Sequence, residues 1–426
     1  IPVSRATLHS SSIKHSSNTV EPLIKTFERK VMTQNKFFGS LLLIAGTTIG
    51  AGMLALPIAS AGLGFGVSSL IMLLLWALMA YTALLMVEIH QFAPSDASLN
   101  QLAHTLLGAK GQVIASIALM FLLYALCAAY IAGGGEQVNQ KLNAWLGLNL
   151  PPQAGAVLFT LLIGTIVGLG THCVDLINRV LFSLKIIALI LMLALLLPQV
   201  EGTHLLELPL EQGLIVSAIP VIFTSFGFHG SIPSVVRYLG VEVKSLRKIM
   251  LLGSALPLLI YLLWQLGCQG VLSQSQLMTN QSLSGFINQL ASVLHSQYLS
   301  SAISVFADLA LATSFLGVSL GLFDFMAANL RQQDTAAGRS ITAAITFVPP
   351  LGFALFYPQG FITALGYAAI ALVILAIFLP VTMVWVQRQT RDKANLPQGY
   401  RVAGGKLGLL LAMLCGVAVI GAQLLG

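Results

Sequence analysis

Long apolar runs separated by short polar segments dominate the chain from residue 37 onward. A helix needs roughly 20 apolar residues to cross the hydrocarbon core of a membrane. Runs of that length recur often enough to predict an all-α polytopic membrane protein with eleven transmembrane helices. The predicted spans cover about 37–61, 65–91, 112–135, 153–171, 174–198, 212–238, 246–272, 299–330, 339–357, 360–386 and 405–425.

Two of these spans contain residues that disfavour a continuous helix. The stretch GTTIGAGMLALP, residues 46–57, holds three glycines, two threonines and a proline, and each internal glycine weakens a helix by about 1 kcal/mol. In the sixth span TSFG at 224–227 corresponds to TTIG at 47–50, and Pro233 corresponds to Pro57. Broken backbone at membrane depth is tolerated where it lines a cavity, so the paired breaks predict a central binding site.

The two broken spans lie five spans apart, and this odd offset gives the two halves of the chain opposite orientations. The pattern therefore predicts a 5+5 inverted repeat, with spans 1–5 at 37–198 and spans 6–10 at 212–386, followed by a further span at 405–425. A glycine-rich stretch used only for close helix packing is the alternative for one break. It does not explain two matched breaks in inverted halves.

Charged residues are few, and their placement predicts the orientation of the spans. Only 8% of the 426 residues are charged and the mean hydropathy is +0.89, whereas a soluble protein carries about 25% charged residues. The net charge of +7 comes mainly from lysines and arginines in short loops between apolar runs, which indicates cytoplasmic loops rather than a nucleic-acid partner. The N-terminus is therefore predicted in the cytoplasm and the C-terminus on the opposite side.

The segment before the first span has a different composition. Residues 1–36 are polar, basic and rich in Ser and His, and we predict a disordered cytoplasmic tail. The chain opens on Ile1, while Met32 begins MTQNKFFGS directly before the first span. We interpret residues 1–31 as an upstream extension, and we predict no cleavable signal peptide.

Enzyme and channel signatures do not occur in the sequence. GAGMLA at 50–55 mimics a dinucleotide-binding motif, but it lies inside a span and has no βαβ context. There is no HExxH, no GxSxG and no cysteine pair, and the eight histidines do not cluster. We therefore predict no enzyme, no cofactor and no metal site, and we interpret the four cysteines as packing residues. A channel would need a continuous polar lining, so a secondary transporter is favoured.

Four motifs resemble those of the aromatic amino acid permeases: IAGTTIGAGMLALPIASAG from residue 44, LWALMAYTALLMVEI from residue 75, TSFGFHGSIPSVVRYLG from residue 224 and ATSFLGVSLGLFDF from residue 312. HGSIPS, with no Asn after its Gly, resembles the tyrosine branch more than the tryptophan branch. The resemblance implies a leucine-transporter-type fold and proton-coupled import of an aromatic amino acid, with tyrosine expected, across a bacterial inner membrane. Tryptophan, phenylalanine or a broader range of neutral amino acids remain alternative substrates, and sodium remains an alternative coupling ion.

An amino acid zwitterion needs one site for its carboxylate and another for its ammonium. The amides at the start of the second half of the broken first span suit the carboxylate. Carbonyls freed at the break in span 6 suit the ammonium, and nearby hydroxyls add further contacts. The predicted substrate-binding residues are Thr47, Thr48, Gly50, Ala51, Gly52, Phe223, Thr224, Phe226, Gly227, His229 and Tyr130.

The aromatic ring of the substrate needs apolar walls and a polar end. Phe226 and Phe228 flank the second break, and Tyr124 or Tyr130 in span 3 is a further candidate, with core packing as the alternative for each tyrosine. His229 lies in the break itself. It is interpreted as a proton carrier or as a hydrogen-bonding gate, and capping of freed carbonyls is the alternative.

Lys185 in span 5 is the candidate for coupling transport to protons. It follows Asn178 by seven residues, so both lie on one helix face. Related amino acid transporters of this fold that lack sodium coupling place a lysine at the sodium position, and the resemblance implies Gly46, Ile49, Thr313 and Ser314 as its partners. Snorkelling to the cytoplasmic face is the alternative.

Three acidic residues lie within or near predicted spans. Asp308 lies deeper in span 8 than the other two acids and is included in the predicted coupling site. Glu88 and Asp324 fall near span ends, where snorkelling and local pairing explain them. The expected partners of the protein are the substrate, protons and the lipid bilayer; the oligomeric state is not predicted.

Overall fold

The computed structural model describes residues 35–147, 149–207, 214–279, 282–293, 297–330 and 335–426. The predicted tail of residues 1–36, with its proposed start at Met32, lies outside the described residues except for its last two positions. The described residues form helices joined by loops, and they contain no strand. The predicted all-α fold is therefore confirmed.

The helices match the predicted spans. Within the described residues, ten helices are long and apolar enough to cross a membrane, and counting one bent pair as a further span gives eleven. The bent pair is Asn35–Thr48 and α2 (Gly52–Ala59), whose axes differ by 49°. The remaining spans are α3 (Gly64–His90), α4 (Leu99–Leu146), α5 (Pro152–Leu169), α6 (Thr171–Leu196), α8 with α9 (Leu214–Ser225 and Ile232–Leu239), α10 (Val243–Val271), α13 (Gln297–Asn329), α14 (Ala336–Phe356), α15 with α16 (Phe361–Val373 and Leu379–Lys393) and α17 (Gly405–Leu425).

Some elements differ in length or kind from the prediction. The third span was expected at 112–135, but α4 begins at Leu99 with a capping box formed by Ser98 and Gln101 and runs through a kink at Gly108. A capping box satisfies amides at a helix start, so the polar residues before the span also become helical. The shorter helices α7 (Gly202–Leu205), α11 (Gln274–Thr279) and α12 (Leu283–Val293) lie in the loops.

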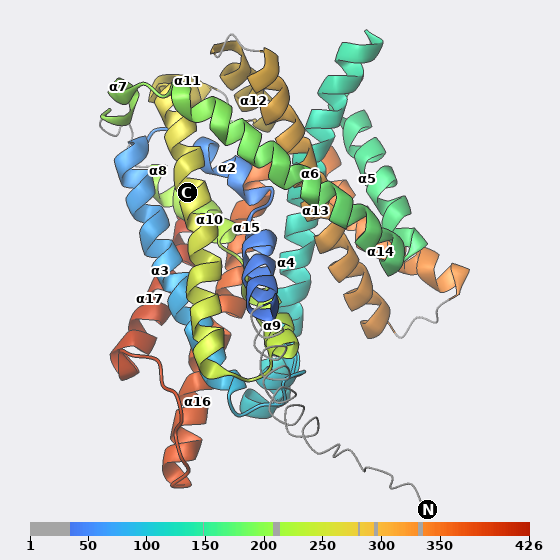
Figure 1. Cartoon of the computed structure of the whole chain (residues 1–426). Coiled ribbons are helices and arrows are strands. Elements are labelled where there is room, and N and C mark those ends of the chain that lie inside the picture. Colours follow the sequence, from blue (N-terminus) through green and yellow to red (C-terminus); the bar gives the residue numbers. More distant parts are fainter. Residues whose placement is uncertain (1–34, 148, 208–213, 280–281, 294–296, 331–334) are drawn as a thin grey trace, which may run out of the picture.

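The two broken spans lie side by side in the interior of the bundle. Contacts join α2 to α8, while α10 packs on α3 and α2. The long helix α4 packs against α5, α13 and α15, and α6 crosses α13 obliquely (Figure 1). This arrangement surrounds the irregular backbone of both breaks with helices, which removes it from lipid.

Candidate functional site

Local side-chain hydrogen bonds accompany the break in the first span. The hydroxyls of Thr47 and Thr48 both donate to the carbonyl of Ile44, at 2.9 and 2.7 Å, in competition with the helical ladder. The helix ends at Thr48 and α2 begins at Gly52. Among the described residues, the amides of Gly50 and Gly52 have no hydrogen-bond acceptor. The break therefore presents two free donors at the positive end of a helix.

Ser314 on α13 holds the middle of this break. The amide of Ala51 donates to Ser314 Oγ at 3.1 Å, and Ser314 lines the same cavity as Tyr130. A Cβ placed on Gly50 would lie 2.6 Å from Ser314 Oγ. Glycine at position 50 therefore permits the close approach of α13 to the broken backbone.

The break in the sixth span has fewer free groups than the sequence predicted. The carbonyls of Phe223, Thr224 and Phe226 accept backbone bonds from Phe226, Gly227 and Phe228. The hydroxyl of Ser225 donates to the carbonyl of Gly52 at 3.0 Å, which joins the end of α8 to the start of α2. Local turns and the hydroxyl of Tyr261 occupy the carbonyls of Phe223 to Phe226, so among the described residues only the carbonyl of Gly227 in this stretch has no donor.

Tyr261 on α10 connects the two breaks. Its hydroxyl lies 2.6 Å from the carbonyl oxygen of Thr48 and 2.9 Å from that of Ser225. The side chain is fully buried and its ring is 5.2 Å from that of Phe226. One phenol therefore fixes the relative position of the irregular segments of spans 1 and 6.

A cavity of about 430 Å³ adjoins both breaks, within the size range of small-molecule sites. Its walls include Leu119, Leu122, Leu123, Leu126 and Phe228. Eleven of the residues selected from the sequence also line it: Gly46, Thr47, Thr48, Gly50, Gly52, Tyr130, Lys185, Thr224, Gly227, Thr313 and Ser314. Ala51 and Ile49 are not among the lining residues, but their backbone bonds to Ser314 and Lys185 attach them to the site.

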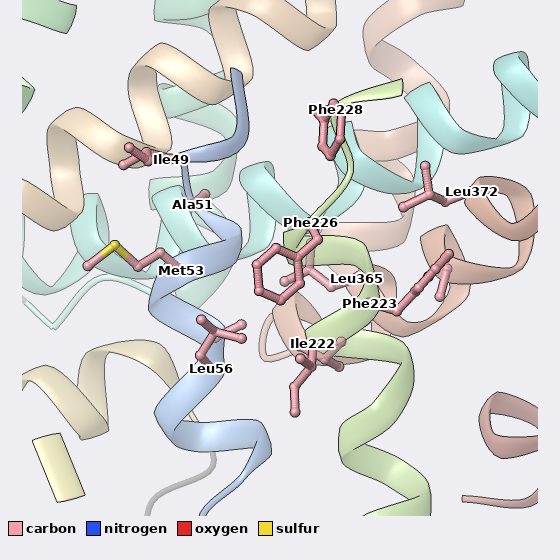
Figure 2. Close-up of a cluster of buried hydrophobic side chains, with 14 of the residues drawn as sticks. Ile49, Ala51, Met53, Leu56, Ile222, Phe223, Phe226, Phe228, Leu365 and Leu372 are labelled. Carbon is pink, nitrogen blue, oxygen red and sulfur yellow. The ribbon is translucent and has the colours of Figure 1, made fainter. Parts of the chain in front are cut away.

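Two of the predicted substrate-binding phenylalanines, Phe223 and Phe226, do not line the cavity. Figure 2 shows the ring of Phe226 between α2 and α8, and Phe223 on the side of α8 that faces away from α2. Both phenylalanines are fully buried. Phe226 fills the contact between the two broken spans, so of the two candidate rings at the second break only Phe228 reaches the cavity.

His229 and Tyr124 also face away from the cavity. Nε2 of His229 lies 2.9 Å from Oγ1 of Thr82 on α3, and its Nδ1 is buried without a partner among the described residues. The hydroxyl of Tyr124 donates to the carbonyl of Ile345 on α14 at 2.8 Å. The short 3₁₀ turn η2 (His229–Ser231) directs the imidazole toward α3, which a sequence pattern does not reveal.

Among the described residues that line the cavity, Lys185 is the single charged one. Its Nζ donates to the carbonyl of Ile49 at 2.9 Å and lies 4.6 Å from the ring centroid of Phe182, and the residue is 2% exposed. It does not snorkel to the surface. Gly46, Thr313 and Ser314 share the cavity with it, but the described contacts of its ammonium include none of them.

Asp308 does not join this group. Its carboxylate pairs with the ammonium of Lys141 near the end of α4. Thr313 is five residues further along α13 and turns toward the cavity, and five residues advance a helix by more than one turn. Asp308 therefore forms an ion pair on a different part of the surface of α13.

The cavity extends to one side of the breaks only. Its lining includes Gly46 and Thr47 before the first break, Gly230 and Ser231 after the second, and Asn178 and Phe182 in the first half of α6, which lie on the side where the chain enters the first span. On the other side, Trp264 Nε1 donates to the carbonyl of Met53 at 3.0 Å, and its ring meets Phe286 edge-on at 6.2 Å. Both aromatic residues are buried, so the packing of α2, α10 and α12 closes this side.

A buried ion pair lies on the cavity side, near the ends of α3 and α16. The guanidinium of Arg388 donates to both carboxylate oxygens of Glu88, at 2.6 and 2.7 Å, and the amide of Val402 also donates to this carboxylate at 2.7 Å. The sequence suggested local pairing for Glu88. Its partner is instead 300 residues away, and an acidic residue inside an apolar run was the only available signal.

The fold and the cavity define a class of protein. Paired broken helices that line a central cavity in an eleven-span bundle are the architecture of a secondary transporter of the leucine-transporter type. A manganese transporter from Eremococcus coleocola, solved in complex with an aromatic bis-isothiourea substituted compound, has a similar fold. Its TM-score is 0.61 at 15% sequence identity, over 93% of this chain and 86% of that one.

The sequence comparisons then identify the family. The model of the tryptophan/tyrosine permease family matches residues 33–423, so the chain belongs to that family. It is similar to Tyrosine-specific transport system 1 of Haemophilus influenzae, at 46% identity over 90% of this chain and 96% of the relative. It is also similar to the Tryptophan-specific transport protein of the same organism, at 35% identity over 91% and 95%. The protein is a multi-pass membrane permease and not an enzyme.

Proposed function

We propose that this permease imports tyrosine together with protons across a bacterial inner membrane. The higher identity to a tyrosine-specific relative than to a tryptophan-specific one supports the choice of substrate. The proposed orientation follows from the distribution of lysines and arginines, with the N-terminus in the cytoplasm. In this orientation the cavity extends toward the cytoplasm, so the conformation is inward-facing.

The free amides of Gly50 and Gly52 are the observation that carries the proposed binding mode. They form the site for the substrate carboxylate, since anions bind well at the N-terminus of a helix. The carbonyls of Gly46 and Thr47, which have no donor among the described residues, accept from the ammonium. This assignment adds the first span to the ammonium site, because at the second break the carbonyls of Phe223 to Phe226 are occupied and only that of Gly227 has no donor among the described residues.

The leucines of α4 and Phe228 form the apolar walls for the ring of the substrate. Tyr130 and Ser314 line the same cavity and add hydroxyl groups to it. We assign the phenol hydroxyl of the substrate to the polar groups of the same cavity rather than to His229. His229 instead fixes the position of the second break through its contact with Thr82.

Lys185 carries the proposed coupling to protons. A buried ammonium bonded to the carbonyl of Ile49 holds α6 against the first break, as a sodium ion at that position would. Release of its proton weakens this link, because a neutral amine is a poorer donor to the carbonyl. Binding and release of the proton thereby favour different positions of the first span relative to α6.

Uptake of radiolabelled tyrosine into proteoliposomes tests the proposal, with proton and sodium gradients imposed separately. We expect accumulation with a proton gradient alone, and tyrosine to compete at lower concentration than tryptophan. Lys185→Ala and Lys185→Arg should lose accumulation, since alanine has no proton to exchange and a guanidinium stays charged. Lys110→Ala, at an exposed lysine on α4, is the matched control. A strict sodium requirement, or full accumulation by Lys185→Ala, would refute proton coupling through this lysine.

A further inference from the structure

A second cavity, distinct from the transport site, lies between the end of α16 and the start of α17. Its volume is about 340 Å³. Figure 1 shows these two helices at one edge of the bundle, where the loop that follows α16 leads to the start of α17. Its walls are formed by Trp385, Arg388, Gln389, Asp392, Lys393, Arg401, Gly405, Lys406 and Leu409.

The charges around this cavity are predominantly positive. Of the four cationic side chains, Arg388 is bound to Glu88, and Arg401 pairs with Asp392 at 3.1 Å. Lys393 and Lys406 have no acidic partner among the described residues. A pocket with two unneutralised ammonium groups favours an anionic ligand.

The backbone at the start of α17 adds to this positive charge. The helix begins after Gly404, whose φ is +94°, and no side chain caps its first amides. Uncapped amides at the start of a helix of 21 residues carry a partial positive charge. The cationic side chains and the uncapped amides at the start of α17 therefore both favour an anion in this cavity.

The neighbouring surface is apolar and identifies the kind of anion. Leu407, Leu410, Leu411 and Leu414 on α17 are 52–65% exposed, and they continue from the cavity along a helix that qualifies as a membrane span. Trp385 is 39% exposed, and the ammonium of Lys406 lies 5.7 Å from its ring centroid. Tryptophan is enriched at membrane–water interfaces, so the charged cavity lies at the level of lipid headgroups.

We propose that this cavity binds the phosphate of an anionic phospholipid, with the acyl chains along the exposed leucines of α17. Basic pockets between membrane helices are suited to such headgroups. Free inorganic phosphate has the same charged group but no apolar chain. It would therefore contact the cations of the cavity but not the exposed leucines of α17. The apolar surface beside the cations favours the lipid.

Thermal unfolding of the detergent-purified protein tests this proposal without reference to transport. We expect phosphatidylglycerol to raise the melting temperature, and phosphatidylcholine and inorganic phosphate to leave it nearly unchanged. In the variant Lys393→Gln/Lys406→Gln, the phosphatidylglycerol concentration required for half of the effect should rise about thirtyfold, or about fivefold for each lysine. Native mass spectrometry should show a matching loss of retained lipid.

The variant Lys244→Gln/Lys248→Gln is the matched control, because it removes the same charge from two exposed lysines at the start of α10. Lys393→Arg/Lys406→Arg keeps the charge at the cavity and should keep the response to phosphatidylglycerol. If Lys244→Gln/Lys248→Gln weakens the response to phosphatidylglycerol as much as Lys393→Gln/Lys406→Gln does, the effect comes from net charge and the proposal is overturned. An equal rise of melting temperature with inorganic phosphate would overturn the assignment to a lipid.

Discussion

The contact between Gly50 and Ser314 gives a quantitative test of how the first break is held. A Cβ on Gly50 would lie 2.6 Å from Ser314 Oγ, whereas its distance to Ser314 Cβ would be 3.8 Å, an ordinary van der Waals contact. Gly50→Ala therefore forces the serine hydroxyl to rotate. The amide of Ala51, which donates to that hydroxyl, then loses its acceptor.

The magnitude follows from the lost hydrogen bond. A buried donor left without a partner costs about 1–3 kcal/mol, so Gly50→Ala should lower the free energy of unfolding by that amount. In the Ser314→Ala background the hydroxyl is already absent and the added methyl has space. There we expect Gly50→Ala to cost less than about 0.5 kcal/mol, a non-additivity typical of residues in direct contact.

Denaturant titration in mixed micelles, followed by tryptophan fluorescence, measures these free energies for the wild type, both single variants and the double variant. Gly317→Ala is the matched control on the same cavity, because a Cβ at Gly317 has no atom within 4 Å. It should be neutral or slightly stabilising, since alanine favours a helix more than glycine does. The reasoning is refuted if Gly50→Ala costs the same with and without the Ser314 hydroxyl.

Three further predictions address the side chains around the breaks. Phe228→Leu should weaken tyrosine binding more than Phe226→Leu, because of these two residues only Phe228 lines the cavity. Equilibrium binding of labelled tyrosine measures both affinities, and a larger loss in Phe226→Leu would contradict the assignment of Phe228 to the site. Glu88→Gln should lower the free energy of unfolding by about 3–5 kcal/mol, because Arg388 loses its buried carboxylate, and an unchanged melting temperature would speak against this. Tyr261→Phe should lower it by about 1–3 kcal/mol through loss of the hydroxyl between the two breaks, while an unaltered denaturation midpoint would show that the phenol does not join them.

The sequence determined the number of spans and the positions of both breaks. Each of these features depends on a local property: the length of an apolar run, or glycine, threonine and proline within it. The four motifs that resemble the aromatic amino acid permeases also lie in the part of the chain that follows Met32. Lys185 was found for the same reason, since a lysine inside an apolar run is conspicuous wherever the chain folds.

The tertiary structure decided which side chains meet at the site. Phe226 and His229 lie in the predicted break, yet one packs between α2 and α8 and the other contacts Thr82. The turn at the break sets these directions, and no periodic pattern describes an irregular turn.

Contacts between segments that are distant in the sequence could likewise not be predicted from the sequence pattern. Asp308 meets Lys141, and Glu88 meets Arg388, across separations of 167 and 300 residues. Spacing along one helix identifies which residues share a face, but it does not identify the helix that packs against that face. The packing of the bundle fixed these pairs, and with them the volume and the lining of the cavity.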